Sequence, residues 1–177
     1  MKNICMTIYT KEQGKIYLTK KEQNNFNFNT VTCHRTDGPA IIWYNQNGSV
    51  WRESYYINNK LHRTDGPAII YYYENGSIDN EYYYINNKLH KIDGPTIIWY
   101  YKDGSVGREE YYINNKRHRT DGPAVIFYNK NGIALSEDYY ITDKYYDKED
   151  YDNLINEMKA LPKSLRLTHE LWWVREL

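Results

Sequence analysis

A block of 28 residues recurs four times along this chain, and no other feature of the sequence constrains the fold as much. The first copy reads HRTDGPAIIWYNQNGSVWRESYYINNKL, and the copies run from His34 to about Tyr145. A fixed period of this length is typical of repeat architectures, in which each unit packs against its neighbours in sequence. Histidines and Asp-Gly-Pro triplets mark the period, at His34, His62, His90 and His118 and from Asp37, Asp65, Asp93 and Asp121.

Each copy contains two segments with the composition of β-strands, joined by turns. Residues 40–44 are β-branched and aromatic, and residues 49–57 end in Tyr-Tyr-Ile, so both are predicted to be strands. The loop between them ends in Gly48, which can adopt a positive φ. Asn58 and Asn59 are predicted to close a tight turn, because asparagine tolerates the left-handed region. The Asp-Gly-Pro triplet predicts a bulge or bend, since proline cannot donate to a strand ladder.

These elements predict a mostly β fold: a single elongated antiparallel β-meander built of four 28-residue hairpin repeats, with two strands per unit and a C-terminal α-helical cap. Residues 1–33 are assigned to a degenerate N-terminal capping segment, 34–145 to the repeats and 146–177 to the helical cap. Strand alternation places Ala40, Ile42 and Tyr44 on one face. Ile41 and Trp43 point to the other, so both faces are partly apolar.

The two ends depart from the repeat, as the ends of a solenoid must. Residues 5–9 and 16–18 resemble a half-unit that caps the first edge, and residues 24–32 are expected to be irregular. Asp147 is a candidate N-cap of a helix that Pro162 ends. The apolar stripe of this helix comprises Tyr151, Leu154, Ile155, Met158 and Leu161. The helix and the tail, with Trp172 and Trp173, are expected to cover the last strand edge.

Composition excludes several classes of protein. The 23 basic and 23 acidic residues balance, which argues against a non-specific nucleic-acid binder that depends on many phosphate contacts. The two cysteines, Cys5 and Cys33, are fewer than the disulfide frameworks of small secreted domains use. No stretch approaches the ~20 apolar residues that span a bilayer, and no secretory leader is visible. The sequence therefore predicts a soluble cytoplasmic protein with no membrane partner.

The rhythm Y-x-x-x-G … Y-Y-x-N-x-K-x-x-x-x-x-G-P resembles MORN-like repeats, and the more similar variant is the one found in antitoxin-like proteins of the YwqK type. The HR-x-DGPA form, seen at residues 62–68, looks like repeat proteins of large DNA viruses and bacteriophages. The resemblance covers the repeats at 34–145 and implies β-hairpins with a binding role. It brings no catalytic residue. The 28-residue unit and its His-Arg-x-Asp segment depart from MORN repeats, so a lipid-contact role is not carried over.

The segment His34-Arg35-x-Asp37 invites an enzymatic interpretation, with histidine as the base and aspartate as its orienting partner. Four equal copies favour a structural interpretation, because an active site needs one constellation in one cleft. A buried aspartate can hold the backbone of its turn, and the arginine can pair with it. Equivalent histidines would lie about 9–10 Å apart and cannot share one zinc ion. We predict no catalytic residue, metal or cofactor.

Aromatic residues recur in columns, and arginines flank them. One interpretation is cross-strand packing that only stabilises the sheet. The other is a platform for planar groups or for a partner protein's surface. The acidic column that starts at Glu53 and the basic column that starts at Lys60 are expected to be solvated. The residues predicted to bind a ligand or partner are Trp43, Tyr44, Arg52, Tyr56, Arg63, Tyr71, Tyr72, Tyr84, Trp99, Tyr100, Arg108, Tyr112, Arg119 and Tyr128.

The function predicted from these features is that of a non-enzymatic binding protein of viral or phage type, which engages and inhibits a host protein, such as a defence protein. One alternative is a sponge that sequesters a small nucleotide-like signalling molecule. Others are an antitoxin-like protein or a structural component, in which the aromatic face is the interface of a homo-oligomer. An enzyme that uses one of the His-Arg-Asp sets is the remaining alternative.

Overall fold

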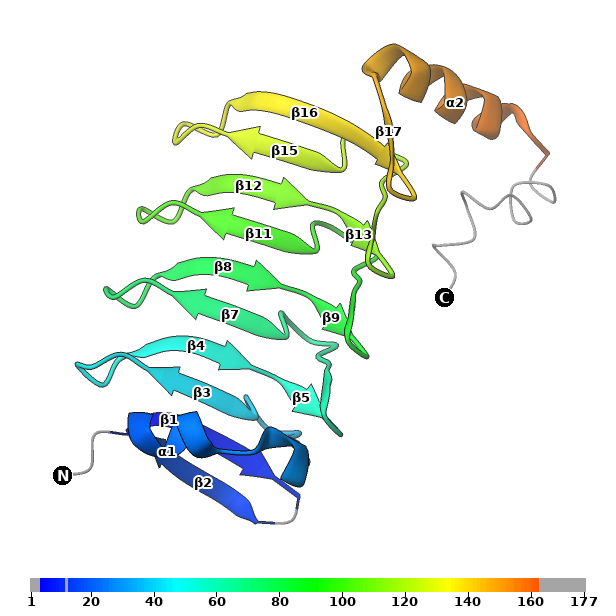
Figure 1. Cartoon of the computed structure of the whole chain (residues 1–177). Helices are drawn as coiled ribbons and strands as arrows, with labels where there is room; N and C mark the ends of the chain where they lie inside the picture. Colours follow the sequence, from blue (N-terminus) through cyan, green and yellow to red (C-terminus); the bar gives the residue numbers. More distant parts are fainter. Residues whose placement is uncertain (1–3, 12, 163–177) are drawn as a thin grey trace.

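In the computed structural model, which describes residues 4–11 and 13–162, the chain is a stack of β-hairpins that grows in one direction (Figure 1). Its main sheet has 11 antiparallel strands in the order β17-β16-β15-β12-β11-β8-β7-β4-β3-β1-β2. The mostly β meander with a C-terminal helix is thereby confirmed. These strands are β1 (Ile4–Thr10), β2 (Gly14–Thr19), β3 (Ile41–Tyr44), β4 (Val50–Ser54), β7 (Ile69–Tyr72), β8 (Ile78–Tyr82), β11 (Ile97–Tyr100), β12 (Val106–Glu110), β15 (Val125–Tyr128), β16 (Ala134–Ile141) and β17 (Lys144–Tyr146).

In the first three units the second strand does not run through to its end, so the expectation of two strands per unit was wrong there, whereas β16 of the fourth unit is continuous. β4 stops at Ser54, because Tyr55 changes partners: its N–H donates to Ala68 O at 2.8 Å, and its carbonyl accepts from His62 N at 3.1 Å. The chain then forms a separate small hairpin. The small hairpins are β5 (Tyr56–Ile57) with β6 (Lys60–Leu61), β9 (Tyr84–Ile85) with β10 (Lys88–Leu89), and β13 (Tyr112–Ile113) with β14 (Lys116–Arg117).

The turns of the small hairpins confirm the prediction from the asparagine pair, and they also join the units. Asn58 and Asn59 have φ of 51° and 62°, in the left-handed region. In the next hairpin, Asn87 donates its N–H to Leu61 O at 2.9 Å, and its Oδ1 accepts from Leu61 N at 2.7 Å. The same two-point clamp links the neighbouring hairpins along the stack. In the fourth unit Asp143 replaces the asparagine and accepts from Arg117 N at 2.7 Å.

The hairpin of each repeat unit in the main sheet contains a β-bulge, and in the first unit it decides where the side chain of Trp51 points. Trp43 pairs with Arg52, whereas Tyr44 pairs with Val50, so Trp51 is the extra residue. The same shift recurs in the other three units. The loop before it closes through Gly48, whose φ is 86°. Strict alternation fails at the bulge, and Trp51 therefore lies on the same side of the sheet as Arg52.

The N-terminal cap extends the sheet, as expected of a half-unit. β1 pairs with β3 from Met6 to Ile8, and both side chains are buried with Leu18, Cys33 and Ile41. The structure corrects the expectation that residues 24–32 are irregular: they include the end of helix α1 (Lys20–Asn25) and the 3-10 turn η1 (Phe28–Thr30). Thr19 and Glu22 form a capping box that starts α1.

The C-terminal helix α2 (Lys148–Ala160) begins where Asp147 accepts from Asp150 N at 2.8 Å, which confirms the predicted N-cap. Tyr151, Ile155 and Met158 pack on Tyr139 and Ile141, which lie on one face of β16. The helix therefore packs on a face of β16, and whether helix and tail together cover the strand edge stays a prediction. Ala134, Leu135, Ser136 and Glu137 of β16 remain exposed. The tail that contains Trp172 and Trp173 lies outside the described residues.

Candidate binding site

The residues predicted from the sequence to form one platform lie on two faces of the sheet. Trp43 and Arg52 are cross-strand partners, and so are Ile42 and Glu53, so the two pairs point to opposite sides. We name the sides the Trp face and the Glu face. The Trp face carries Trp43, Arg52, Tyr56, Tyr71, Tyr84, Trp99, Arg108 and Tyr112. The Glu face carries Tyr44, Arg63, Tyr72, Tyr100, Arg119 and Tyr128.

The Trp face carries a continuous ladder of aromatic rings. Ring centroids are separated by 6.2 Å from Trp43 to Trp51, and by 5.9 Å at each further step to Tyr71, Tyr82 and Trp99. Such tilted and edge contacts are favoured by the ring quadrupole. Sequence reasoning missed Trp51, because only the bulge turns it to this face. It missed Tyr82, because the equivalent position holds Ser54 and Glu110 in other units and forms no aromatic column.

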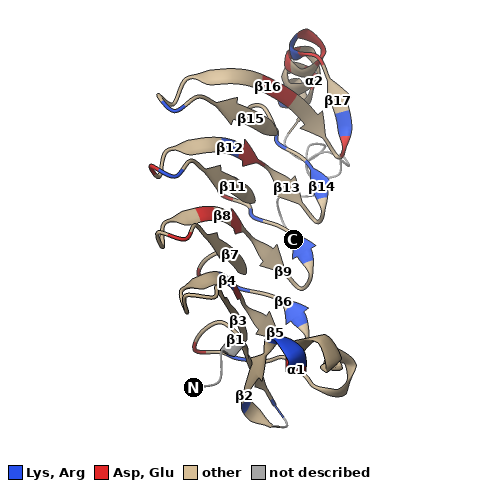
Figure 2. Ribbon diagram, turned by 60° about the vertical axis from the view of Figure 1, so that its left-hand side comes forward, with Lys and Arg blue, Asp and Glu red and all other residues tan. Residues whose placement is uncertain are grey.

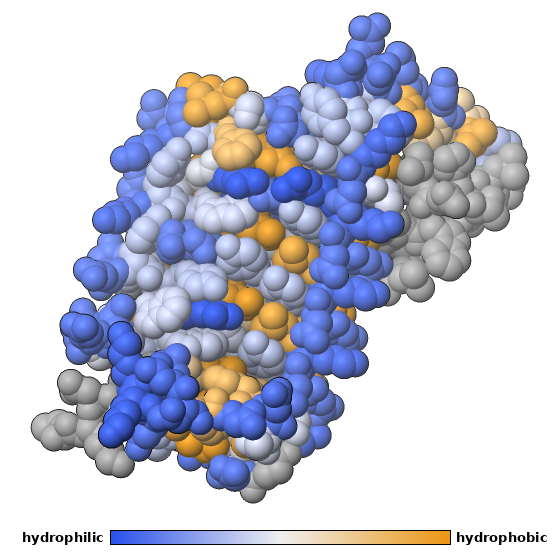
Figure 3. All heavy atoms as spheres, viewed as in Figure 1, coloured by the Kyte–Doolittle hydropathy of each residue, from blue (hydrophilic) through white to orange (hydrophobic). Residues whose placement is uncertain are grey.

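Two arginines lie between rings of this ladder. The guanidinium carbon of Arg52 is 4.3 Å from the Trp43 ring centroid and 5.2 Å from that of Tyr71. Arg108 lies 4.6 Å from both Trp99 and Phe127. The rings of Trp43, Tyr71 and Trp99 are only partly buried. On the side of the stack that the space-filling view shows, pale surface of intermediate hydropathy lies among hydrophobic patches and hydrophilic side chains (Figure 3). The face thus offers both ring surface and charge to a partner.

The third unit contains a buried carboxylate at the centre of a charged cluster. Glu110 is 3% exposed, and it forms ion pairs with Arg108 Nη2 at 2.6 Å and Arg117 Nε at 3.2 Å. The hydroxyl of Tyr112 donates to Glu110 at 2.7 Å. Burial, together with this hydrogen bond, raises the pKa of Tyr112 to about 12. The Glu110 carboxylate thus has its partners within the chain, and two cations share this one anion.

The tyrosines on the Glu face connect neighbouring units through their hydroxyls. Tyr72 donates to Glu53, Tyr100 to Glu81 and Tyr128 to Glu109, each at 3.0 Å. Burial raises the pKa of Tyr128 to about 12, with the Glu109 carboxylate adding to the effect. Glu53, Glu81 and Glu109 are therefore not the solvated edge that was expected, whereas Glu137 is exposed. The lysines at the tips of the small hairpins are exposed as expected and appear as blue patches along the stack in Figure 2.

The His-Arg-x-Asp segments hold their own bends, as the structural interpretation proposed. Arg63 Nε donates to Asp65 at 2.9 Å, Nη1 donates to Pro67 O at 3.3 Å, and the guanidinium stacks 4.0 Å from the Tyr55 ring. Arg35 and Arg119 repeat this arrangement, and Lys91 lies over Tyr83 in the third unit. The expectation of a buried aspartate was wrong, because the Asp65 side chain is 81% exposed. Arg63 and Arg119 are thus committed to the fold.

A residue larger than glycine in the Asp-Gly-Pro bend should destabilise the fold, because the arginine of the same segment packs on that glycine. A Cβ at Gly66 would lie 2.9 Å from Arg63 Cζ. We expect Gly66→Ala to lower the free energy of unfolding by about 1 kcal/mol, measured by urea denaturation. The cost should shrink in an Arg63→Lys background, since Lys91 in the third unit lies farther from its glycine, at 3.6 Å. An equal cost in both backgrounds would show that the arginine contact is not the cause.

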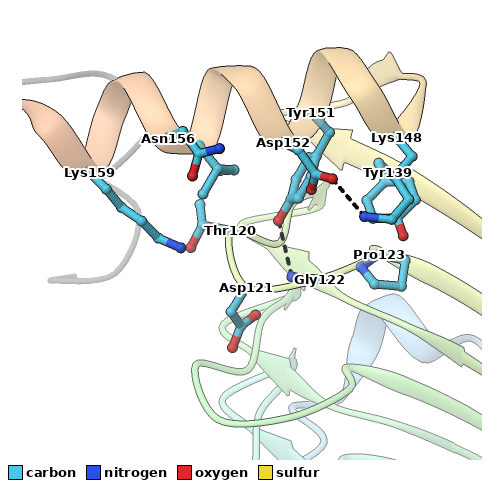
Figure 4. A pocket seen from close by; sticks show the side chains of 11 residues that line it. Thr120, Asp121, Gly122, Pro123, Tyr139, Lys148, Tyr151, Asp152, Asn156 and Lys159 are labelled. Carbon is cyan, nitrogen blue, oxygen red and sulfur yellow. Dashed lines mark hydrogen bonds and ion pairs between the residues drawn. The ribbon is translucent and has the colours of Figure 1, made fainter.

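Three clefts lie beside these bends, away from the ladder. One of about 360 Å³ is lined by Arg35, Asp37, Tyr55 and Arg63, and one of about 110 Å³ by Lys91, Tyr111 and Arg119. The third, also about 360 Å³, lies between the last bend and α2 (Figure 4). In it the Tyr151 hydroxyl accepts from Gly122 N at 3.0 Å, and Lys148 pairs with Asp152 at 2.7 Å. The polar groups of these clefts serve mainly to hold the bends and α2.

Within residues 4–11 and 13–162, no group of three or more His, Cys, Asp or Glu side chains is arranged to hold a metal ion. In the same part of the chain, no helix is long and apolar enough to cross a membrane. No family model, curated protein or solved structure matches this chain. The aromatic ladder on the Trp face is therefore identified as the candidate binding site from its geometry alone.

Proposed function

We propose that this chain is a non-enzymatic binding protein whose Trp face engages a partner protein and inhibits it. The observation that carries the proposal is the partly exposed ladder from Trp43 to Trp99, with arginines stacked between its rings. Tryptophan, tyrosine and arginine are the residues that dominate the binding energy of protein interfaces. A rigid sheet presents them with little entropy left to lose on binding.

The repetition of the chain supports binding rather than catalysis. His34 Nδ1 accepts from Asn58 N at 3.2 Å, and His62 contacts the side chain of Asn86 at 3.1 Å. These two histidines thus contact the turns of small hairpins, whereas the aspartates of their segments pair with the arginines. A base and its orienting carboxylate would have to be hydrogen-bonded to each other.

We further propose that the partner is a host protein, such as a defence protein, and that the chain is viral or phage-derived and acts in the host cytoplasm. The support for this part is the resemblance of the HR-x-DGPA segments to repeat proteins of large DNA viruses and bacteriophages. The aromatic ladder supports only the binding role, and it does not support a viral origin or a host partner.

A second candidate is sequestration of a nucleotide-like signal. It is favoured by one observation, the stacking of Arg52 between Trp43 and Tyr71, because planar anionic ligands use guanidinium and ring surfaces. The phosphate experiment described below separates it from protein binding.

The binding role is tested by affinity capture from host lysate with two variants. We expect Trp99→Ala to weaken binding of the captured protein at least tenfold, because it removes a central ring of the ladder. Tyr17→Ala is the matched control: Tyr17 is 52% exposed on β2, and no ladder contact involves it. Circular dichroism confirms that both variants fold.

The proposal fails if the two variants bind the captured protein equally well. It also fails if the only protein bound by the Trp face is a second copy of this chain. Sedimentation velocity of the purified protein at two concentrations detects that case.

A further inference from the structure

Arg52 differs from every other arginine in the described part of the chain, because it forms no ion pair. Arg35, Arg63 and Arg119 each pair with the aspartate of their own bend, and Arg108 and Arg117 pair with Glu110. The carboxylate adjacent in sequence, Glu53, points to the opposite face and accepts a hydrogen bond from Tyr72. The fold thus holds a cation on the Trp face and supplies no anion to it.

The surroundings of Arg52 keep it in place and leave polar atoms unsatisfied. Its guanidinium lies between the rings of Trp43 and Tyr71, and its Nε is buried without an acceptor. Ser54 lies on the same face, is 0% exposed, and its hydroxyl has no hydrogen-bond partner. The cross-strand neighbours of Ser54 are Ile41 and Ile69, which offer none. Buried polar groups without partners destabilise a fold, so Arg52 and Ser54 mark a place where this chain supplies no matching acceptor.

In the third unit, a carboxylate occupies the position that corresponds to Ser54 beside Arg52. Arg108 occupies the position of Arg52 and is likewise stacked between two rings, while Glu110 occupies the position of Ser54. The Glu110 carboxylate meets the terminal Nη2 of Arg108 at 2.6 Å. The Nε of Arg108 has no partner either, so the difference between the units lies at the terminal nitrogens and at the serine. The first unit has the same cation in the same stack, and a hydroxyl in place of the carboxylate.

We propose that Arg52 binds a side-chain carboxylate supplied by the partner protein, which takes the place that Glu110 holds in the third unit. The proposal rests on the proposed function and deepens it by naming an acidic residue as the recognised group. Tyr56 occupies the position of Tyr112, whose hydroxyl donates to Glu110, and it offers the same donor. Leu61 replaces Arg117, so the first unit presents one cation and suits a monoanion better than a phosphate dianion.

The site can be observed directly by NMR of the arginine Nε–H groups in the full chain. We expect hexaglutamate to shift the Arg52 resonance saturably, and hexaglutamine, its neutral isostere, to leave it unmoved. A shift of Arg52 by inorganic phosphate that exceeds the shift by hexaglutamate would overturn the assignment to a carboxylate and favour the nucleotide-like ligand. No shift of Arg52 with any of these anions would overturn the site itself.

Variants then test whether the carboxylate occupies the predicted place. Ser54→Glu recreates the third unit, so we expect the added glutamate to pair with Arg52 and to weaken hexaglutamate binding at least tenfold. Arg52→Gln should abolish the binding. If Ser54→Glu does not fold, Arg52→Gln alone tests whether Arg52 binds the carboxylate. Lys60→Gln removes an exposed cation of the same unit and should leave binding unchanged. Equal loss with Lys60→Gln and Arg52→Gln would reveal general charge attraction and overturn the proposal.

The two proposals can fail separately. If the captured partner depends on Trp99 but binds the Arg52→Gln variant as well as the wild type, the carboxylate site is wrong and the binding role stands. If hexaglutamate binds at Arg52 but neither Trp99→Ala nor Arg52→Gln affects capture, the site exists and the proposed role of the Trp face is wrong.

Discussion

Replacing Glu110 with glutamine should lower the free energy of unfolding by about 3 kcal/mol, because two arginines are left beside a neutral group. Glu110 is 3% exposed, whereas the side chains of Arg108 and Arg117 are 30% and 36% exposed, so water can solvate part of each cation. We therefore place the loss at the lower end of the range for a broken buried ion pair. Urea denaturation followed by tyrosine and tryptophan fluorescence measures it.

The adjacent glutamate is a matched control on the opposite face. Glu109 accepts from the hydroxyls of Tyr111 and Tyr128 and pairs with no arginine in the described part of the chain. Glutamine can accept the same hydrogen bonds, so we expect Glu109→Gln to cost less than about 1 kcal/mol. Equal losses for the two variants would contradict the central role assigned to the Glu110 cluster.

Asn87→Ala should lower the free energy of unfolding by about 2 kcal/mol, from two separate causes. Alanine tolerates the φ of 66° at this position poorly, and it removes the Oδ1 that accepts from Leu61 N at 2.7 Å. The second cause loosens the contact between the first and second small hairpins. Equilibrium unfolding gives the total, and hydrogen exchange at the Leu61 amide reports the lost bond.

Two further substitutions at Asn87 separate these causes. Asn87→Gly relieves the backbone strain but lacks the acceptor, so its cost should be intermediate. Asn87→Asp keeps the acceptor and should be close to wild type, because Asp143 makes the same bond at 2.7 Å in the fourth unit. If Asn87→Asp were as destabilising as Asn87→Ala, the clamp between hairpins would not be a source of stability.

Much of the fold follows from local patterns in the sequence. The 28-residue period, the strand composition of residues 40–44 and the paired asparagines all act within a few residues, and the structure confirms the stack of hairpins that they predict. Asp147 likewise predicts the start of α2. The capping box of Thr19 and Glu22 was an available signal for α1 that sequence reasoning overlooked.

The candidate site was predicted less completely, because its geometry depends on contacts between units. The residue types were recognised, yet they divide between two faces. The bulge at Trp51 adds a ring to the Trp face against the expected alternation. Tyr55 divides the second strand, because its N–H donates to Ala68 whereas its carbonyl accepts from His62, which follows the small hairpin.

By itself the sequence determined the repeating unit, its turns and the helical end, since periodicity and backbone preference are local properties of the chain. Only the tertiary structure decided which charges are matched. An arginine finds or lacks a carboxylate according to the face and the unit onto which each side chain is folded. Arg108 is paired and Arg52 is not because Glu110 stands where the first unit has Ser54, and only the fold shows that each of these residues shares a face with its arginine.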